Sequence, residues 1–252
     1  DRSSVSVRYQ VHNKGDGPAK IALRPHSGLR FPGTVEGLDG LLSEDSWFYA
    51  PAPQGVRSMK DAHFKPRPGE VLTSGDFVEV DPVDGWTAGR SVSGVGFAAT
   101  MDWSLLDAVL TWCDKYTGAT VEWGFLEQAL TPGDRHEAGY TFSFFTGMPP
   151  IAGAREDVAV GIELPEPVPA GAPAPIRVAV GSGRARPGIT VTLELATRPD
   201  ARGSVVGETR LDLAPGVAGQ AAFQAALADN ATHVLTAVVR ENGREIARGV
   251  RV

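Results

Sequence analysis

Apolar and polar residues alternate along short runs of this sequence, and that period of two constrains the fold more than any other feature. Two such runs lie between residues 118 and 145, separated by the segment Thr131-Pro132-Gly133-Asp134. Proline presets φ for a turn and glycine accepts a positive φ, so the chain can reverse at this segment without strain. We therefore expect two antiparallel strands joined by this turn, each with one apolar face. The apolar members are Val121, Trp123, Phe125, Tyr140, Phe142 and Phe144.

Composition favours an all-β fold with many turns, because the 252 residues include 30 glycines and 19 prolines. Hydrophobic residues make up 42% of the chain and charged residues 21%, values typical of globular proteins. The length suffices for one large or two ordinary domains, and we expect two antiparallel β-sandwiches.

Charge and hydropathy exclude two classes of partner. The net charge of −6 and the pI near 5.4 provide no basic field for a phosphate backbone, so nucleic acid is not an expected partner. The sequence contains no run of roughly 18 apolar residues, the length that a membrane-spanning helix needs.

Cys113 is the only cysteine, which excludes an internal disulfide and a cysteine-rich metal site. The first residues lack an initiating Met and a hydrophobic signal core, so we expect the chain to begin inside a longer gene product.

The first 30 residues contain a second informative pattern. Ser4 to His12 alternates as a strand, a polar turn starts at Asn13, and Ala19 to Leu23 returns as a partner strand that leads to the motif His26-Ser27-Gly28-Leu29. This pattern, together with a glutamate at 122 followed by Leu-x-Pro-Gly-acidic and an aromatic strand, resembles galactose-mutarotase-like (aldose-epimerase-like) β-supersandwiches. The resemblance covers roughly the first 150 residues and places the histidine before the glutamate, as in that family.

The resemblance implies that residues 1–155 form a partial mutarotase-like β-sandwich, because the full supersandwich is about twice as long. Half a supersandwich leaves sheet edges and an apolar face, here Val121, Trp123 and Phe125, uncovered. We therefore expect a missing N-terminal segment, a second chain or a homo-oligomer to cover that face.

The resemblance also implies chemistry. His26 would act as general acid toward a sugar ring oxygen and Glu122 as base on the anomeric hydroxyl, because imidazole and carboxylate can exchange a proton in one ring-opening step. The alternative is that Glu122 is an exposed strand residue and His26 a hydrogen-bonded loop residue. Aromatic rings match the apolar face of a pyranose, so Trp47, Tyr49 and Trp123 are further candidates for substrate contact. His63, a polar group close to aromatic residues, is another candidate. No spacing matches a metal or cofactor motif, so none is expected.

Two segments allow two interpretations each. Residues 24–55 break the alternation with Gly, Pro and the run Trp47-Phe48-Tyr49, which fits either an aromatic plug at the end of the sandwich or a sugar platform. Ser104 to Tyr116 has apolar residues at three- and four-residue spacing, which favours a short helix, whereas β propensity and the family resemblance favour a strand after Leu110.

Aromatic residues become scarce after Phe145, and a proline-rich segment from Glu163 to Pro175 follows. Beyond it, short alternating runs recur at roughly ten-residue spacing, and Asn242-Gly243 marks a hairpin. This pattern predicts an immunoglobulin-like or fibronectin-like sandwich over residues 156–252.

Three functions remain open. The chain could be the sandwich portion of a larger carbohydrate-processing enzyme, a non-catalytic carbohydrate-binding protein, or a structural subunit that pairs sheet edges with another chain. Enzyme activity is therefore undecided. We favour an extracellular or periplasmic bacterial location over a cytoplasmic one.

Overall fold

The fold is all-β, as the alternation and the turn residues predict. A computed structural model describes residues 2–28, 46–53, 55–59, 76–80, 82–91, 94–114, 118–165, 173–198, 201, 203–227 and 232–252, with the backbone alone at 28, 46, 47, 57–59, 76–80, 111–114 and 118–120. The described residues form antiparallel strands, and the 3-10 turn Trp103–Leu105 is the helical element among them. No helix in these ranges is long and apolar enough to cross a membrane.

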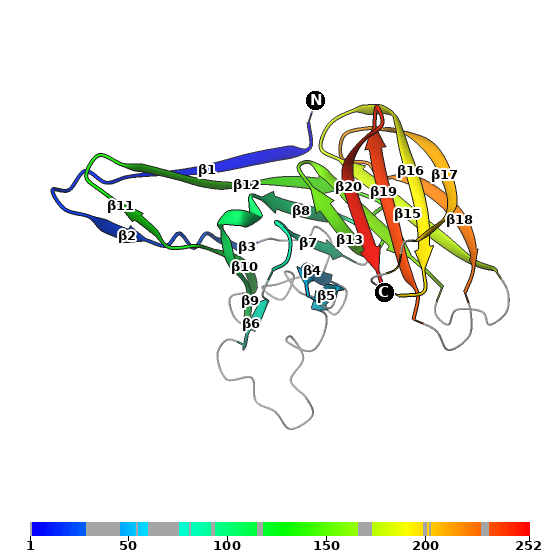
Figure 1. Ribbon diagram of the computed structural model, residues 1–252, viewed down its shortest axis with the longest axis horizontal. Coiled ribbons are helices and arrows are strands. Elements are labelled where there is room, and N and C mark those ends of the chain that lie inside the picture. The colour runs from blue at the N-terminus through cyan, green and yellow to red at the C-terminus, as the bar shows by residue number, and fades with distance from the viewer. Residues whose placement is uncertain are drawn as a thin grey trace, which may run out of the picture.

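One side of the first sandwich is a six-stranded sheet. Its strand order is β1 (Ser4–His12), β12 (Arg135–Phe145), β8 (Gly96–Met101), β7 (Trp86–Ser91), β4 (Ser46–Ala52) and β5 (Gly55–Met59). Strands β1 and β12 pair along their whole common length, from Ser4 opposite Ser143 to His12 opposite Arg135. In Figure 1 this pair forms a long ribbon that extends away from the C-terminal strands.

The opposing sheet has four strands. Its order is β3 (His26–Gly28), β10 (Gly118–Phe125), β9 (Leu106–Asp114) and β6 (Asp76–Val80). A separate pair, β2 (Ala19–Ile21) with β11 (Gln128–Leu130), lies beneath the far end of the β1–β12 ribbon in Figure 1.

The two alternating runs between 118 and 145 do not form the expected hairpin. Strand β10 pairs with β3 and β9, and β12 pairs with β1 and β8, so the two runs belong to different sheets. The turn at 131–134 exists, with Gly133 at φ 89° and a bond from the Asp134 amide to the Thr131 carbonyl, but it joins β11 to β12. Periodicity identifies a buried face, and two strands that face each other across a core have the same periodicity as two strands that pair.

The apolar face of β10 is covered within this chain, which corrects the expectation that it would be left open. Val121, Trp123 and Phe125 are 2%, 0% and 3% exposed. The ring centroid of Trp123 lies 4.6 Å from that of Tyr140 and 5.6 Å from that of Phe142, both on β12. The six-stranded sheet therefore supplies the cover that another chain was expected to provide.

Of the ambiguous segment at 104–116, the residues Leu106–Asp114 form a strand. After the turn Trp103–Leu105, in which the Asp102 side chain accepts a bond from the Ser104 amide, β9 runs from Leu106 to Asp114. It pairs with β10 on one side and β6 on the other. Leu106 and Val109 are buried in the core, so sheet pairing and burial override the helical spacing.

The C-terminal half is a second sandwich of two four-stranded sheets. The first sheet is β13 (Ile151–Arg155), β14 (Val158–Glu163), β15 (Pro173–Ser182) and β18 (Gly219–Ala226). The second is β17 (Ser204–Leu213), β16 (Arg186–Ala196), β19 (Val234–Glu241) and β20 (Arg244–Arg251). Their inner faces share a core that includes Val160, Val178, Val191 and Val239. The Asn242-Gly243 turn joins β19 to β20, with Asn242 at φ 51°.

A third apolar cluster joins the two sandwiches. It contains Trp86 from the six-stranded sheet and Met148, Ile151 and Ala179 from the residues that follow it. Gly181 packs so closely there that a Cβ at this position would lie 2.5 Å from Cδ1 of Phe145. Backbone bonds also cross the junction, for example from the Ser3 amide to the Gly183 carbonyl at 2.9 Å. The predicted boundary after residue 155 falls in the turn between β13 and β14, which pair with each other.

Candidate functional site

His26 and Glu122 are direct neighbours across the short pair of strands β3 and β10. The register places Glu122 opposite His26. The pairing continues beyond β3, since the Trp123 amide donates to the Pro25 carbonyl at 3.3 Å and the Phe125 amide to the Leu23 carbonyl at 2.9 Å. Side chains of directly opposed residues lie on the same face of a sheet, so both groups lie on the face opposite to the core.

The Glu122 carboxylate connects two basic side chains. Its Oε1 lies 3.5 Å from Nε2 of His26, and its Oε2 accepts a hydrogen bond from Nε of Arg24 at 2.5 Å. A charge-assisted bond of this kind fixes the direction of the carboxylate. The three residues therefore form one ion cluster on the outer face of the β3–β10 pair.

Burial differs across this cluster. The Glu122 side chain is 9% exposed, whereas those of Arg24 and His26 are 50% and 58% exposed. A buried carboxylate requires charged or hydrogen-bonding partners, and Arg24 is such a partner. The alternative that Glu122 is an exposed strand residue is therefore wrong. Arg24 and His26 are the members that a bound molecule could reach, and His26 is the one of the two that can exchange a proton near neutral pH.

The sequence pattern alone does not identify Arg24 as a partner of Glu122. Arg24 lies two residues before His26, and alternation in an extended chain places residues two apart on one face. This spacing is a signal, but the segment from Arg24 onward has no alternating pattern, so the sequence predicts an irregular run there. An isolated arginine there did not indicate a partner for Glu122.

The structure does not bring Trp123 and Tyr49 to this cluster. Trp123 lies on the core face of β10, fully buried, where its Nε1 donates to Oγ1 of Thr87 at 3.0 Å. Tyr49, on β4, is 4% exposed in the cluster between the two sandwiches, and its burial raises its pKa to about 12. Trp47 pairs in register with Arg90, with only its backbone described, and His63 lies outside the described residues.

The distances limit what the cluster can do chemically. An acid and a base that act on opposite sides of a pyranose must leave room for the ring, and a separation of 3.5 Å between Nε2 and Oε1 does not. The arrangement fits a different division of roles, in which the buried carboxylate orients the imidazole and the exposed imidazole exchanges a proton with a bound molecule.

Among the described residues, no three or more His, Cys, Asp or Glu side chains gather in a group that could hold a metal ion. Comparison of the sequence with protein-family models finds no family that matches. A search of curated proteins finds no significant match either. The geometry of the site is therefore the guide to its function.

Proposed function

We propose that this protein processes a carbohydrate on the outer face of the β3–β10 pair, with His26 as the group that exchanges a proton with the sugar and Glu122 as the residue that orients it. The observation that carries the proposal is the contact between a half-exposed imidazole and a buried carboxylate at 3.5 Å. A histidine exchanges protons near neutral pH, and a carboxylate on one ring nitrogen sets which nitrogen carries the proton. His26 is thus the group that contacts the sugar.

Glu122 orients the His26 imidazole, and Arg24 in turn holds Glu122 in place. Arg24 holds one carboxylate oxygen at 2.5 Å, which leaves the other oxygen directed at His26. An imidazole that is already fixed in this orientation loses less entropy when it is positioned for the reaction. The proposed reaction class is ring opening and closure of a reducing sugar, as in the aldose epimerases that the sequence resembles. The proposed setting is a mutarotase-like region followed by an immunoglobulin-like module in a larger enzyme.

One observation favours a second candidate, a non-catalytic carbohydrate-binding protein. Both oxygens of Glu122 already face basic groups, and a carboxylate engaged by arginine can be a structural element of the sheet. In that case the exposed arginine and histidine would bind a sugar through hydrogen bonds alone. The two candidates differ in whether any bond is made or broken at the site.

Polarimetry of anomer interconversion tests the proposal. Pure anomers of a panel of reducing sugars, including glucose and galactose, are followed with and without the protein. If the protein is a catalyst, His26→Gln and Glu122→Gln each lower the rate on the order of a hundredfold or more. Glu127→Gln, at an exposed carboxylate bonded to Lys20, is the matched control and leaves the rate unchanged.

Binding is measured on the same variants by calorimetry. Retained sugar affinity with lost turnover supports the catalytic role. Unchanged rates in both His26→Gln and Glu122→Gln contradict it, and sugar binding without any rate enhancement favours the binding protein. His26→Gln alters an exposed side chain, so it keeps the test informative if Glu122→Gln proves unstable.

A further inference from the structure

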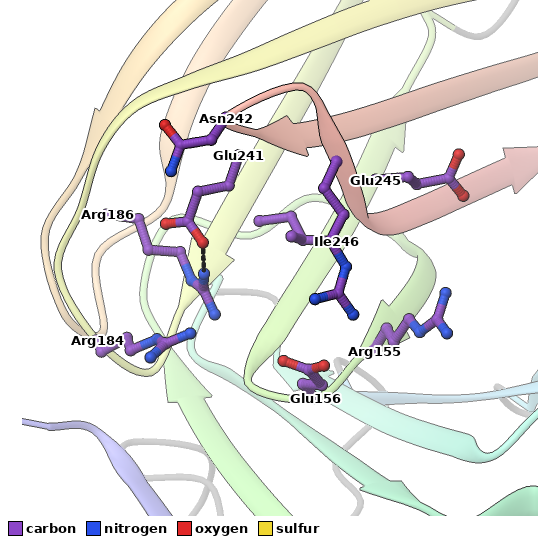
Figure 2. A pocket seen from close by; sticks show the side chains of 9 residues that line it. Arg155, Glu156, Arg184, Arg186, Glu241, Asn242, Glu245 and Ile246 are labelled. Carbon is purple, nitrogen blue, oxygen red and sulfur yellow. Dashed lines mark hydrogen bonds and ion pairs between the residues drawn. The ribbon is translucent and has the colours of Figure 1, made fainter.

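A polar pocket lies at one end of the C-terminal sandwich, where the turns β13–β14, β15–β16 and β19–β20 meet (Figure 2). Its volume is about 270 Å³. Pockets for small molecules span roughly 300–1,000 Å³, so this one suits a ligand the size of a single sugar unit. It is built from other elements than the β3–β10 face.

Arg186 forms the frame of this pocket. Its side chain is 1% exposed, and its guanidinium donates to Oγ of Ser182 at 3.1 Å, to Glu241 at 2.6 Å and to Asp157 at 2.6 Å. These bonds tie the three turns together, and Figure 2 shows the contact between Arg186 and Glu241. Because every nitrogen of Arg186 is used, this residue positions the pocket and is not available to a ligand.

Three further arginines line the pocket with unused donors. Arg184 approaches Asp157 only to 3.5 Å, and the other oxygen of that carboxylate is held by Arg186. Neither Arg155 nor Arg244 forms an ion pair or a side-chain hydrogen bond with any residue that the structure describes. All three residues are exposed at the rim. A guanidinium presents a planar pair of donors that matches the oxygens of a carboxylate or phosphate.

The nearby carboxylates neutralise these arginines only in part, although the charge of Arg155 also acts on Glu245 and helps to lower its pKa. Glu245 is engaged by Arg248, with its two oxygens 3.1 and 2.9 Å from the guanidinium nitrogens. That hydrogen bonding lowers the pKa of Glu245 and keeps it ionised. Glu241 and Asp157 bind Arg186. The remaining positive charge is therefore that of Arg155, Arg184 and Arg244 at the exposed rim of the pocket, where a ligand would enter.

Glu156 adds an acceptor to the same pocket. It forms no ion pair with the described residues, and Figure 2 shows its carboxylate between Arg184 and Arg155 in that view. Its backbone has φ 51°, which is uncommon for glutamate, and its carbonyl accepts a bond from Oγ1 of Thr100 at 2.5 Å. The first sandwich thereby helps to hold Glu156 at the pocket. A carboxylate repels a plain anion but accepts a hydrogen bond from a hydroxyl group.

We propose that this pocket binds a small hydroxylated carboxylate, of the kind that a uronic-acid residue presents. Arg155, Arg184 and Arg244 take the carboxylate, and Glu156 takes a neighbouring hydroxyl. No bond is made or broken there. The proposal does not depend on catalysis at His26, and it would stand if that proposal failed.

Calorimetric titration of the intact chain tests it with three probes: glucuronate, glucose and inorganic sulfate. We expect saturable binding of glucuronate that weakens as salt is added, weaker binding of sulfate, and no measurable binding of glucose. Binding of glucose as strong as that of glucuronate would overturn the role of the arginines. Sulfate binding tighter than glucuronate binding would overturn the role of Glu156. Phosphate serves as a second inorganic anion, and it too should bind more weakly than glucuronate.

Variants assign the contacts. Arg155→Ala and Arg244→Ala should each raise the Kd for glucuronate about tenfold, and Arg244→Lys should restore it only in part, since lysine lacks the planar fork. Glu156→Gln should weaken glucuronate binding but strengthen sulfate binding. Arg210→Ala, at an exposed arginine on β17 outside the pocket, is the control and should change nothing. Absence of saturable glucuronate binding, or equal weakening by Arg210→Ala, would contradict the proposal.

Discussion

The carboxylate of Glu122 lies 3.5 Å from the imidazole of His26 across two paired strands, although the two residues come from opposite ends of the first sandwich sequence. Glu122 is nearly buried and His26 is half-exposed. This difference assigns orientation to the carboxylate and contact with a ligand to the imidazole. The consequences for stability can be measured independently of any activity.

Arg24→Ala should destabilise the fold, because it removes a bonded partner from a carboxylate that is 9% exposed. We expect a loss of about 1–2 kcal/mol in the free energy of unfolding, below the value for a fully buried pair because Arg24 itself is half-exposed. Urea denaturation measures it. Lys20→Ala removes the solvent-exposed pair with Glu127 and should cost clearly less, so equal losses in the two variants would be inconsistent with a special role for Arg24.

Thr87→Val should cost about 1–3 kcal/mol, because valine has nearly the same shape but leaves Nε1 of the fully buried Trp123 without its acceptor. The same denaturation experiment applies. Ser6→Ala breaks a bond to Thr141 that is exposed to solvent, and it should change stability by less than about 0.5 kcal/mol. If Thr87→Val were as mild as Ser6→Ala, the indole would not depend on this hydroxyl.

Stability should fall in strongly basic solution through Tyr49. Burial raises the pKa of this phenol from 10.0 to about 12, so the unfolded chain loses its proton first as the pH rises. The stabilisation is complete below pH 10 and is lost between about pH 10 and 12, in total on the order of 3 kcal/mol. Denaturation at a series of pH values measures the slope, and Tyr49→Phe should reduce it. Part of the slope remains in that variant, because the bond with Tyr140 raises the pKa of Tyr9 to about 12 as well.

Arg186→Ala should be the most damaging of these substitutions. It leaves Asp157 and Glu241 without the guanidinium that both bind at 2.6 Å, and we expect a loss of about 3–5 kcal/mol. Thermal and urea unfolding measure it, with Arg177→Ala, at an exposed pair with Glu163, as the control. A loss no larger than that of the control would show that the three turns are held together without this ion cluster.

Local pattern predicts the strands of this chain well. The alternation from Ser4 to His12 coincides with β1, and Asn242-Gly243 forms the predicted hairpin turn. Spacing alone could not assign β9, because its apolar residues fit a helix equally well. Its strand form results from pairing with β10 and β6, which is a tertiary effect.

Pairing between strands could not be inferred from the pattern. The aromatic residues of β10 and β12 face each other across a core, and neighbouring strands in one sheet would show the same alternation. For the same reason the burial of Glu122 could not be predicted, since an acidic residue in an alternating strand normally faces water. Arg24, which makes that burial tolerable, lies in a segment without periodicity.

The most direct test of the proposed site follows the side-chain NMR signals of His26 while reducing sugars are added to the intact protein. If His26 contacts the sugar and Glu122 orients it, its imidazole resonances should shift and saturate with at least one sugar, and Glu122→Gln should alter both the starting position and the response. The signal of His12, on β1 of the other sheet, is the internal reference and should not move. Unchanged His26 resonances at high concentrations of every sugar in the panel, in a folded protein, would contradict the proposed function.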